Sequence, residues 1–389
     1  MEKTAIEVIG SDKCTSCFGC YNVCPIPGAI AMGIDSEGFF RPITTEKCIK
    51  CGICQDGCPV VHSTNVNGQL TKIYAAWSLN DHIRVNSSSG GIFSEVAAEI
   101  LKENGVVYGV GWDNGRVRHL KVIHAHDIQL IRKSKYLQSN VGNSYKDIKR
   151  QLRQGRKVFF VGTPCQVAAL NKIIRDKKNL LTADLVCHGV PSLKAFEKYT
   201  HENFKKKIEK VDFRNKKTGW SNYSVVYYSA DGIEKKTIFR YDKFFYGFLK
   251  DIFLNKACYN CEFSTFPREG DLTLGDFWGV PSGLKNEKGV SVLTVNNANG
   301  IDIVHKIHEA GRVILREIDF YTATKGNKAL CNGKLEIPID REAFFSEIDM
   351  KSFDELSNSY FMPPSKFKYQ FERVIRGIAR RLPGKHLKR

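Results

Sequence analysis

The chain has 389 residues, a formal net charge of +18 and 42% hydrophobic residues. A chain of this length is expected to form two or three domains. No apolar run approaches the roughly 18 residues needed to cross a bilayer, which argues against an integral membrane protein. The first residues, Met1 to Thr4, lead into charged sequence without the apolar stretch of a secretion signal, so we expect a cytoplasmic location.

Thirteen cysteines are present, and eight of them crowd into residues 14–58. A disulfide framework needs an oxidising compartment and usually a short secreted chain. In a cytoplasmic protein the thiols stay reduced, so metal ligation is the better interpretation.

The eight clustered cysteines form two sets with the same spacing, each followed by proline: Cys14, Cys17, Cys20 and Cys24 before Pro25, then Cys48, Cys51, Cys54 and Cys58 before Pro59. The pattern C-x2-C-x2-C-x3-C-P is typical of bacterial segments that hold two [4Fe–4S] clusters. Three thiolates of a set bind one cubane, and the fourth, beside proline, binds the other. We therefore group Cys58 with the first three cysteines, and Cys24 with Cys48, Cys51 and Cys54.

Zinc sites and unligated thiols are the alternatives for these cysteines. Zinc sites generally pair two C-x2-C units across a longer gap and do not need the trailing proline. We expect residues 1–62 to form an α+β ferredoxin-like dicluster segment.

Bound clusters change the charge balance, because each cubane with four thiolates carries a net negative charge. Two clusters lower the total to about +14, and a third lowers it to about +12. Residues 362–389 contain nine Lys or Arg residues and one acid, Glu372. The main body is therefore only mildly basic, and we expect no nucleic-acid partner.

After a polar linker, residues 62–68, the sequence alternates between strand-like and helix-like segments. The apolar patterns predict strands near 73–79, 105–111, 157–161, 181–187 and 222–229, and helices near 90–103, 144–154, 166–176 and 192–206. Alternation on this scale favours an α/β domain with a mostly parallel or mixed sheet covered by helices.

Ordered motifs in this region resemble the coenzyme F-420 hydrogenase/dehydrogenase beta-subunit family. They are Ser87-Ser88-Ser89-Gly90-Gly91, Ser134-Lys135-Tyr136-Leu137-Gln138-Ser139, Gly162-Thr163-Pro164-Cys165-Gln166, Cys187-His188-Gly189, Phe213-Arg214-Asn215-Lys216, Gly219-Trp220, Cys258-Tyr259-Asn260-Cys261 and Gly275-Asp276-Phe277-Trp278-Gly279. The resemblance covers about residues 73–345 and implies an FAD-containing domain with its own [4Fe–4S] cluster. Such a domain passes electrons between a reduced organic cofactor, such as a deazaflavin, and iron–sulfur partners.

Four further cysteines are candidates for the third cluster. Cys165 and Cys187 follow buried-strand runs, where open α/β sheets place their ligands, and Cys258 and Cys261 form a C-x2-C pair. From the residues alone, ordinary buried thiols remain an alternative; the resemblance favours the cluster. Cys331 has no partner at a useful spacing, and we interpret it as a plain thiol.

The prediction of a bound flavin rests mainly on the family resemblance. Ser87, Ser88, Ser89, Gly90 and Gly91 open a helix whose N–H groups and dipole suit a pyrophosphate, although serine and glycine are also common helix starts. No G-x-G-x-x-G follows a predicted strand. The resemblance adds Thr163, Arg214 and Lys216 as cofactor-binding candidates. A flavin also suits the chemistry, because it exchanges two electrons with hydride donors and single electrons with clusters.

Three residues are candidates for catalysis: His188 as a proton relay, Lys135 as a cation for an anionic ligand, and Asp276 as a carboxylate that orients a ligand hydroxyl. A structural histidine, a solvated lysine and a turn aspartate are the respective alternatives.

In residues 362–389, apolar positions recur every three or four residues among basic ones. This pattern predicts a cationic amphipathic helix suited to an anionic membrane surface, or one packed on the domain.

These observations predict an iron–sulfur flavoprotein oxidoreductase whose partners are a ferredoxin or other redox subunit and an organic substrate or reduced deazaflavin. Relatives in bacteria often accompany cell-surface polysaccharide synthesis, which makes a sugar-related substrate compatible with the resemblance. The alternatives are a non-catalytic relay subunit of a hydrogenase or dehydrogenase, and a scaffold that uses clusters only for folding.

Overall fold

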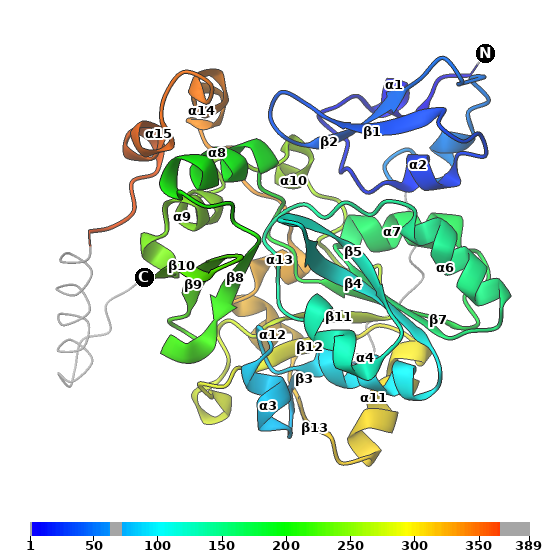
Figure 1. The fold of residues 1–389 in the computed structure, drawn as a ribbon. Helices are drawn as coiled ribbons and strands as arrows, with labels where there is room; N and C mark the ends of the chain where they lie inside the picture. The colour runs from blue at the N-terminus through cyan, green and yellow to red at the C-terminus, as the bar shows by residue number, and fades with distance from the viewer. Residues whose placement is uncertain (1, 63–71, 366–389) are drawn as a thin grey trace.

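A computed structural model describes residues 2–62 and 72–365 of the chain (Figure 1). Most of the predicted linker and, from residue 366 onward, the predicted basic helix lie outside the described residues. Among the described residues, no helix is long and apolar enough to cross a membrane.

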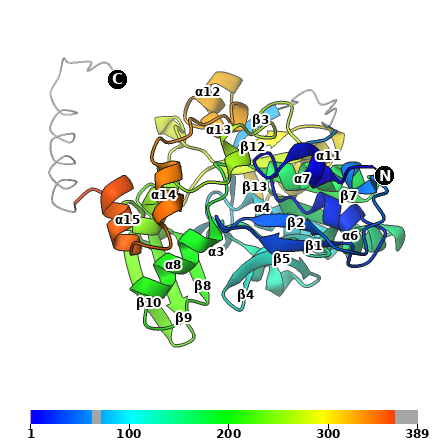
Figure 2. The same ribbon diagram turned by 90° about the horizontal axis from the view of Figure 1, so that it is seen from above.

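The N-terminal segment is a small α+β unit. Its elements are α1 (Ala5–Ile9), α2 (Gly19–Val23), the antiparallel hairpin of β1 (Ile30–Ile34) and β2 (Phe40–Thr44), and a 3-10 turn (Ile53–Gln55). Phe18 and Phe40 pack into the same core as Tyr145, Val158 and Val167 of the larger domain. Both ribbon views accordingly place this unit beside α6 and α7 (Figures 1 and 2).

The larger domain is built on an eight-stranded mixed sheet in the order β13-β3-β12-β11-β7-β6-β4-β5. Its strands are β3 (Lys72–Ser78), β4 (Val106–Asp113), β5 (Arg116–Val122), β6 (Val158–Gly162), β7 (Leu180–Leu185), β11 (Leu272–Asp276), β12 (Ser291–Val295) and β13 (Val313–Glu317). β4, β6, β7 and β11 are parallel neighbours, and β3 runs in their direction because β12 is antiparallel to both β11 and β3. The mixed sheet predicted from the sequence is confirmed.

Helices cover both faces of this sheet. They are α3 (Asp81–Val85), α4 (Ile92–Lys102), α5 (Ile128–Ile131), α6 (Ser144–Arg153), α7 (Pro164–Ile173), α11 (Ala298–Glu309), α12 (Phe320–Lys325) and α13 (Lys328–Cys331). Alternate strand residues point to opposite faces. Val107 and Phe159 pack under α4, α5 and α11, whereas Val106 and Phe160 pack under α6 and α7.

A second, three-stranded antiparallel sheet has the order β10-β9-β8. It comprises β8 (Lys210–Asn215), β9 (Ser224–Ser229) and β10 (Gly232–Ile238), packed with α8 (Leu193–Asn203), α9 (Lys243–Leu249), α10 (Lys256–Tyr259), α14 (Arg341–Glu347) and α15 (Phe353–Tyr360). The core of this region is rich in aromatic rings, such as Tyr199, Phe244 and Phe353. The strand predicted near 222–229 therefore exists as β9, but its hydrogen-bonding neighbours place it outside the main sheet.

Candidate functional site

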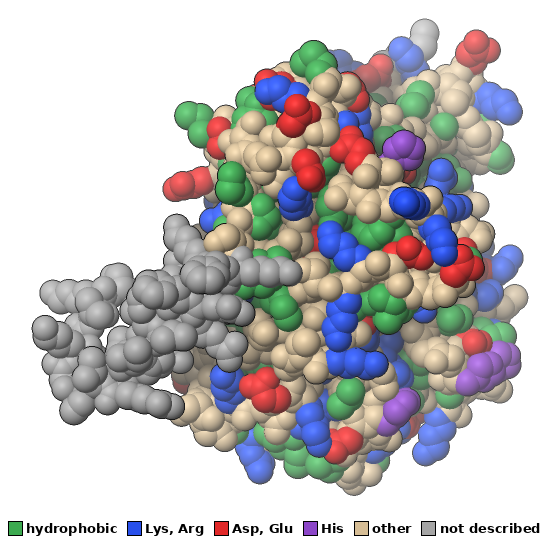
Figure 3. Space-filling view, turned by 60° about the vertical axis from the view of Figure 1, so that its left-hand side comes forward, with side chains coloured by type: hydrophobic (Ala, Val, Ile, Leu, Met, Phe, Trp, Pro, Cys, Tyr) green, Lys and Arg blue, Asp and Glu red, His purple; other side chains and the backbone are tan. Residues whose placement is uncertain are grey.

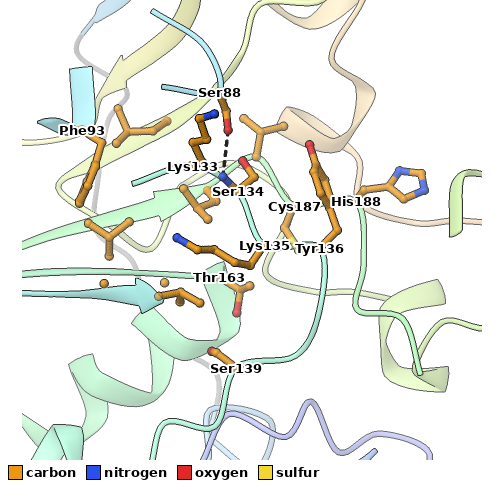
Figure 4. Close-up of a pocket in the computed structure, with 18 of the residues that line it drawn as sticks. Ser88, Phe93, Lys133, Ser134, Lys135, Tyr136, Ser139, Thr163, Cys187 and His188 are labelled. Atoms are coloured by element: carbon orange, nitrogen blue, oxygen red, sulfur yellow. Dashed lines mark hydrogen bonds between the residues drawn. The ribbon is translucent and has the colours of Figure 1, made fainter. Parts of the chain in front are cut away.

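A cavity opens at the carboxyl edge of the main sheet (Figure 4). The loops that follow β3, β6, β7 and β11 meet there, because these strands run in the same direction. They bring Ser87 to Ser89, Thr163, Cys187, His188 and Asp276 to one wall, and residues 131–139 form another. The cavity volume is about 240 Å³.

The serine loop before α4 is held by its own hydroxyl groups. Ser88 Oγ accepts a hydrogen bond from the Ser134 N–H (2.8 Å), and Ser89 Oγ donates to the Val290 carbonyl (2.7 Å). Gly91 adopts φ 90°, a region that favours glycine, and α4 begins at the next residue. The loop therefore presents the start of an eleven-residue helix to the cavity, where an anion is stabilised by the helix dipole.

Lys135 extends into this cavity (Figure 4). Burial lowers its pKa to about 7, and the nearby Asp212 carboxylate only partly offsets that effect. Its Nζ donates to the Arg132 carbonyl (2.7 Å), whereas Lys133 pairs with Asp212 (2.7 Å). Lys135 is thus a cation whose charge changes near neutral pH.

His188 lies at the edge of the cavity with its side chain 36% exposed. Its Nε2 is 2.6 Å from Asp251 Oδ1, and its ring meets Phe248 edge-on with centroids 5.1 Å apart. A carboxylate in this position orients the ring. The three predicted catalytic residues, His188, Lys135 and Asp276, all line one cavity.

Arg214 and Lys216 lie in the protein interior beside this cavity rather than on its wall. Arg214 is fully buried, 2.8 Å from Asp276 Oδ2, with its guanidinium over the rings of Tyr223 (3.8 Å) and Trp278 (4.9 Å). Lys216 Nζ donates to the backbone carbonyls of Arg84 (2.6 Å), Ser89 (2.9 Å) and Lys288 (2.6 Å). Lys216 therefore uses all three Nζ hydrogens to bond backbone carbonyls, and it supports the serine loop from the protein interior.

Four cysteines converge next to the cavity. Cys165 starts α7, Cys187 follows β7, and Cys258 lies on α10 shortly before Cys261. Burial raises the pKa of Cys165 to about 12, and the neighbouring thiols of Cys261 and Cys187 contribute to this rise. Burial and Cys261 likewise raise the pKa of Cys187 to about 12. We call these four residues the core quartet.

The eight N-terminal cysteines lie close together, and Cys20 and Cys58 each lie near Cys54 as well as near Cys14. Burial raises the pKa of Cys20, and so do the nearby thiols of Cys17, Cys14 and Cys58. We call Cys14, Cys17, Cys20 and Cys58 the inner quartet, and Cys24, Cys48, Cys51 and Cys54 the outer quartet.

In the outer quartet, burial raises the pKa of Cys54, with contributions from Cys48 and Cys24. Cys54 Sγ also accepts a hydrogen bond from the Ala5 N–H (3.2 Å), and Cys51 is exposed at the surface.

Among residues 2–62 and 72–365, no three His, Cys, Asp or Glu side chains lie close enough to hold one ion together. The thiolates of a cubane stand farther apart, because each binds a different iron. Glycine is needed at Gly19, since a Cβ there would lie 2.0 Å from the Gly57 carbonyl oxygen and so would prevent the close approach of the two loops.

The inner quartet lies against the core quartet. The Cys17 thiol lies near enough to Cys165 that a negative charge on Cys165 raises the pKa of Cys17. Asn255, next to α10, donates from Nδ2 to the Cys14 carbonyl (3.1 Å), and the Tyr145 hydroxyl is 2.9 Å from the Cys17 carbonyl oxygen. Thr15 reaches the cavity wall itself. The structure therefore orders the thiol groups as outer quartet, inner quartet, core quartet and cavity.

Sequence reasoning did not single out the cavity residues Thr15, Lys133 and Phe248, and it quoted Tyr136 and Ser139 in a motif without giving either a role. It also missed Asp251, the partner of His188. The segment around Lys135 carried a usable signal, because two lysines and a tyrosine alternate with serines there. Asp251 gives no such signal, since its role depends on a fold contact 63 residues away in the chain.

The fold and the site define an α/β protein with a cavity at the strand ends and three neighbouring groups of cysteine thiols. Residues 155–320 match the family described as the C terminus of the beta subunit of coenzyme F420 hydrogenase/dehydrogenase. The family resemblance inferred from the motifs is therefore confirmed over these residues, which contain the whole core quartet. Over residues 155–320 the chain is similar to the C terminus of this family of redox subunits.

Among solved structures, a chain of the F420-reducing [NiFe] hydrogenase complex from Methanosarcina barkeri, studied by xenon derivatization, is similar at 15% identity. The alignment covers 76% of this chain and 97% of that chain, with a TM-score of 0.46. No curated protein matches the sequence.

Proposed function

We propose that the chain is an iron–sulfur flavoprotein oxidoreductase that carries electrons between a ferredoxin-type partner and an organic substrate or deazaflavin. The observation that carries this proposal is the succession of thiol groups that leads from the exposed Cys51 to the wall of one cavity. One-electron centres at one end and a ligand cavity at the other are the parts that such an enzyme requires.

The donor sets fit [4Fe–4S] clusters. Each quartet supplies four cysteines, the ligand type and number that a cubane takes. The repeated spacing predicts that each N-terminal quartet takes its fourth cysteine from the other set, and the Ala5 N–H bonds to the Cys54 sulfur. Hydrogen bonds of this kind tune the potentials of bound clusters. The N-terminal segment would hold two clusters and the core quartet a third.

The cavity suits the ring end of a flavin. Its volume of about 240 Å³ is close to the lower end of ligand pockets, about 300–1,000 Å³, so a whole dinucleotide would extend beyond it. The backbone from Ser87 to Gly91 at the start of α4 would bind the phosphates, and Thr163 would add a hydroxyl group. Bound flavin would supply the exchange between one-electron and two-electron transfer.

The chain's own residues would bind and protonate the substrate. Lys135 would hold an anionic group of the ligand, and near pH 7 it can also release its proton. His188, oriented by Asp251, would pass a proton between the cavity mouth and solvent. Asp276 would act as a positioning residue, because Arg214 and the Trp220 Nε1 (2.9 Å) both hold its carboxylate.

Anaerobic purification followed by analysis of iron, sulfide and flavin tests the proposal. We expect about twelve irons and twelve sulfides per chain, three times the content of a single cubane, together with flavin. Replacement of Cys258 by serine should remove about four irons, whereas Cys331→Ser, a matched change outside the quartets, should remove none.

Specific outcomes would contradict parts of this proposal. Flavin with only about eight irons would rule out the core cluster. Clusters without flavin would favour the second candidate, a non-catalytic relay subunit of a hydrogenase or dehydrogenase complex. Zinc as the only metal would reject the whole proposal.

A further inference from the structure

A broad groove lies between the N-terminal segment and the helices α6 and α7. Its volume is about 810 Å³, and its basic lining residues are Lys146, Lys149, Arg150, Arg153, Lys172 and Arg175. Two acids, Asp56 and Asp176, are the only carboxylates among its lining residues. We call this surface the basic groove.

Most of the positive charge in the basic groove faces outward. Lys149 and Arg153 are exposed, and no ion pair is formed by either within the described residues. By contrast, the face in Figure 3 carries Lys and Arg interspersed with Asp and Glu. Ion pairs such as Lys243–Asp354 (2.7 Å) and Lys206–Asp231 (2.7 Å) neutralise charge elsewhere in the molecule.

The basic groove adjoins the outer quartet. Val23 lines it and is followed directly by Cys24, and Asp56 lines it two residues after Cys54. In the same quartet Cys51 is exposed, and Ile49, two residues before it in the chain, is 67% exposed. Exposed cations close to a redox site are suited to receive a protein of opposite charge.

We propose that the basic groove is the docking surface for an acidic protein that carries one electron at a time and delivers it to the outer quartet. This proposal rests on the proposed function, because it requires a cluster in the outer quartet. On docking, the reduced carrier loses one electron and the oxidised outer cluster gains it, and no bond forms or breaks. The cations steer the acidic carrier to this end of the chain, which is the end farthest along the thiol series from the substrate cavity.

Charge reversal in the basic groove tests this assignment. The experiment uses the full-length, cluster-loaded protein under anaerobic conditions, with a reduced acidic dicluster ferredoxin as the probe. Stopped-flow absorbance measures the second-order rate of reduction. In the double variant Lys149→Glu/Arg153→Glu, we expect this rate to fall by about 10- to 100-fold at low salt, since electrostatic steering accounts for factors of that size. At high salt, the two proteins should react at similar rates, because salt screens the attraction.

The matched control is Lys205→Glu/Lys207→Glu, which changes the charge equally at exposed lysines outside the groove. It should keep the wild-type rate. Equal rates in the groove variant and the wild type, or equal losses in both double variants, would overturn the docking proposal. So would a groove variant that loses only binding to a single-stranded oligonucleotide, since that result assigns the groove to nucleic acid.

Reduction by dithionite separates this proposal from the proposed function. Dithionite should reduce the clusters of all three proteins equally. If dithionite reduces the clusters but ferredoxin reduces all three proteins at the same rate, only the assignment of the docking surface is wrong. If dithionite reduces nothing, the proposed function fails, and the docking surface fails with it.

Discussion

The buried ion pair between Arg214 and Asp276 gives a sharp test of how the cavity floor is built. Arg214 is fully buried, and its nitrogens make no well-aligned hydrogen bond within the described part of the chain. Burial would lower the pKa of its guanidinium, but the Asp276 carboxylate and neighbouring tyrosines raise it overall. Charge attraction at 2.8 Å therefore holds this side chain in place. Replacement of either partner leaves a buried charge without its counter-charge.

The structure sets the size of each effect. Asp276→Asn keeps an acceptor for Trp220 Nε1 but removes the negative charge, and we expect it to lower the free energy of unfolding by about 3–5 kcal/mol. Arg214→Met, which leaves the carboxylate 10% exposed and still bonded to Trp220, should cost about 3 kcal/mol. The double variant removes both charges and should cost only about 2–4 kcal/mol, so the two changes couple by at least about 2 kcal/mol.

Urea unfolding of the cluster-loaded protein measures these differences. The stacked rings of Trp220 and Trp278, with centroids 5.4 Å apart, provide a fluorescence signal at the site itself. The control is Asp349→Asn, which breaks the exposed pair with Lys194 and should change the free energy of unfolding by less than about 1 kcal/mol. Costs that add within about 0.5 kcal/mol would refute the reasoning, because independent sites are additive to that degree.

Three further predictions concern the cavity, the junction and the tail. Burial lowers the pKa of Lys135 to about 7, so FAD binding to flavin-stripped protein should weaken as the pH rises through about 7. In fluorescence titrations, Lys135→Arg should flatten this pH profile. A pH profile identical in both proteins would contradict the role of Lys135. Asn255→Ala removes one of the two donors to the Cys14 carbonyl, the other being Arg41 Nη1, and should cost about 0.5–1.5 kcal/mol in urea unfolding. An unchanged midpoint would show that the junction does not depend on this contact. Truncation before Lys366 should abolish co-sedimentation with anionic liposomes, and unchanged binding would reject the membrane role predicted for the tail.

Several elements with clear apolar patterns were predicted from the sequence, but β12, whose residues are all buried, was not. The strand predicted at 157–161 is β6, whose residues are all buried, and the helix predicted at 144–154 is α6 within one residue. β10 was missed because its side chains are exposed or half-buried and give no alternation. β13 was missed because it is a short edge strand. The sheet to which β9 belongs depends on pairing with β8 and β10, which no local pattern records.

The candidate site was predictable where chemistry fixes spacing. The grouping of Cys58 with Cys14, and of Cys24 with Cys54, follows from the repeat and stays a prediction, because in the structure the Cys58 thiol lies near both Cys14 and Cys54. The position of Lys216 was not predictable, because the sequence does not reveal whether the ammonium group of a lysine contacts a ligand or, as here, three backbone carbonyls. Cationic residues in a motif indicate that a binding site is near, but they do not reveal which atoms their side chains contact.

The junction between the N-terminal segment and the larger domain explains why polar contacts matter there. The apolar contacts of Phe18 and Phe40 favour association, but apolar packing is non-directional and tolerates sliding. The hydrogen bonds from Asn255 and Tyr145 end on the carbonyls of Cys14 and Cys17, so they fix the inner quartet loop itself. Buried groups of this kind are costly to leave unpaired, which penalises every displaced arrangement. The same contacts that stabilise the junction therefore hold the inner and core quartets at one separation, which the proposed one-electron path between them would require.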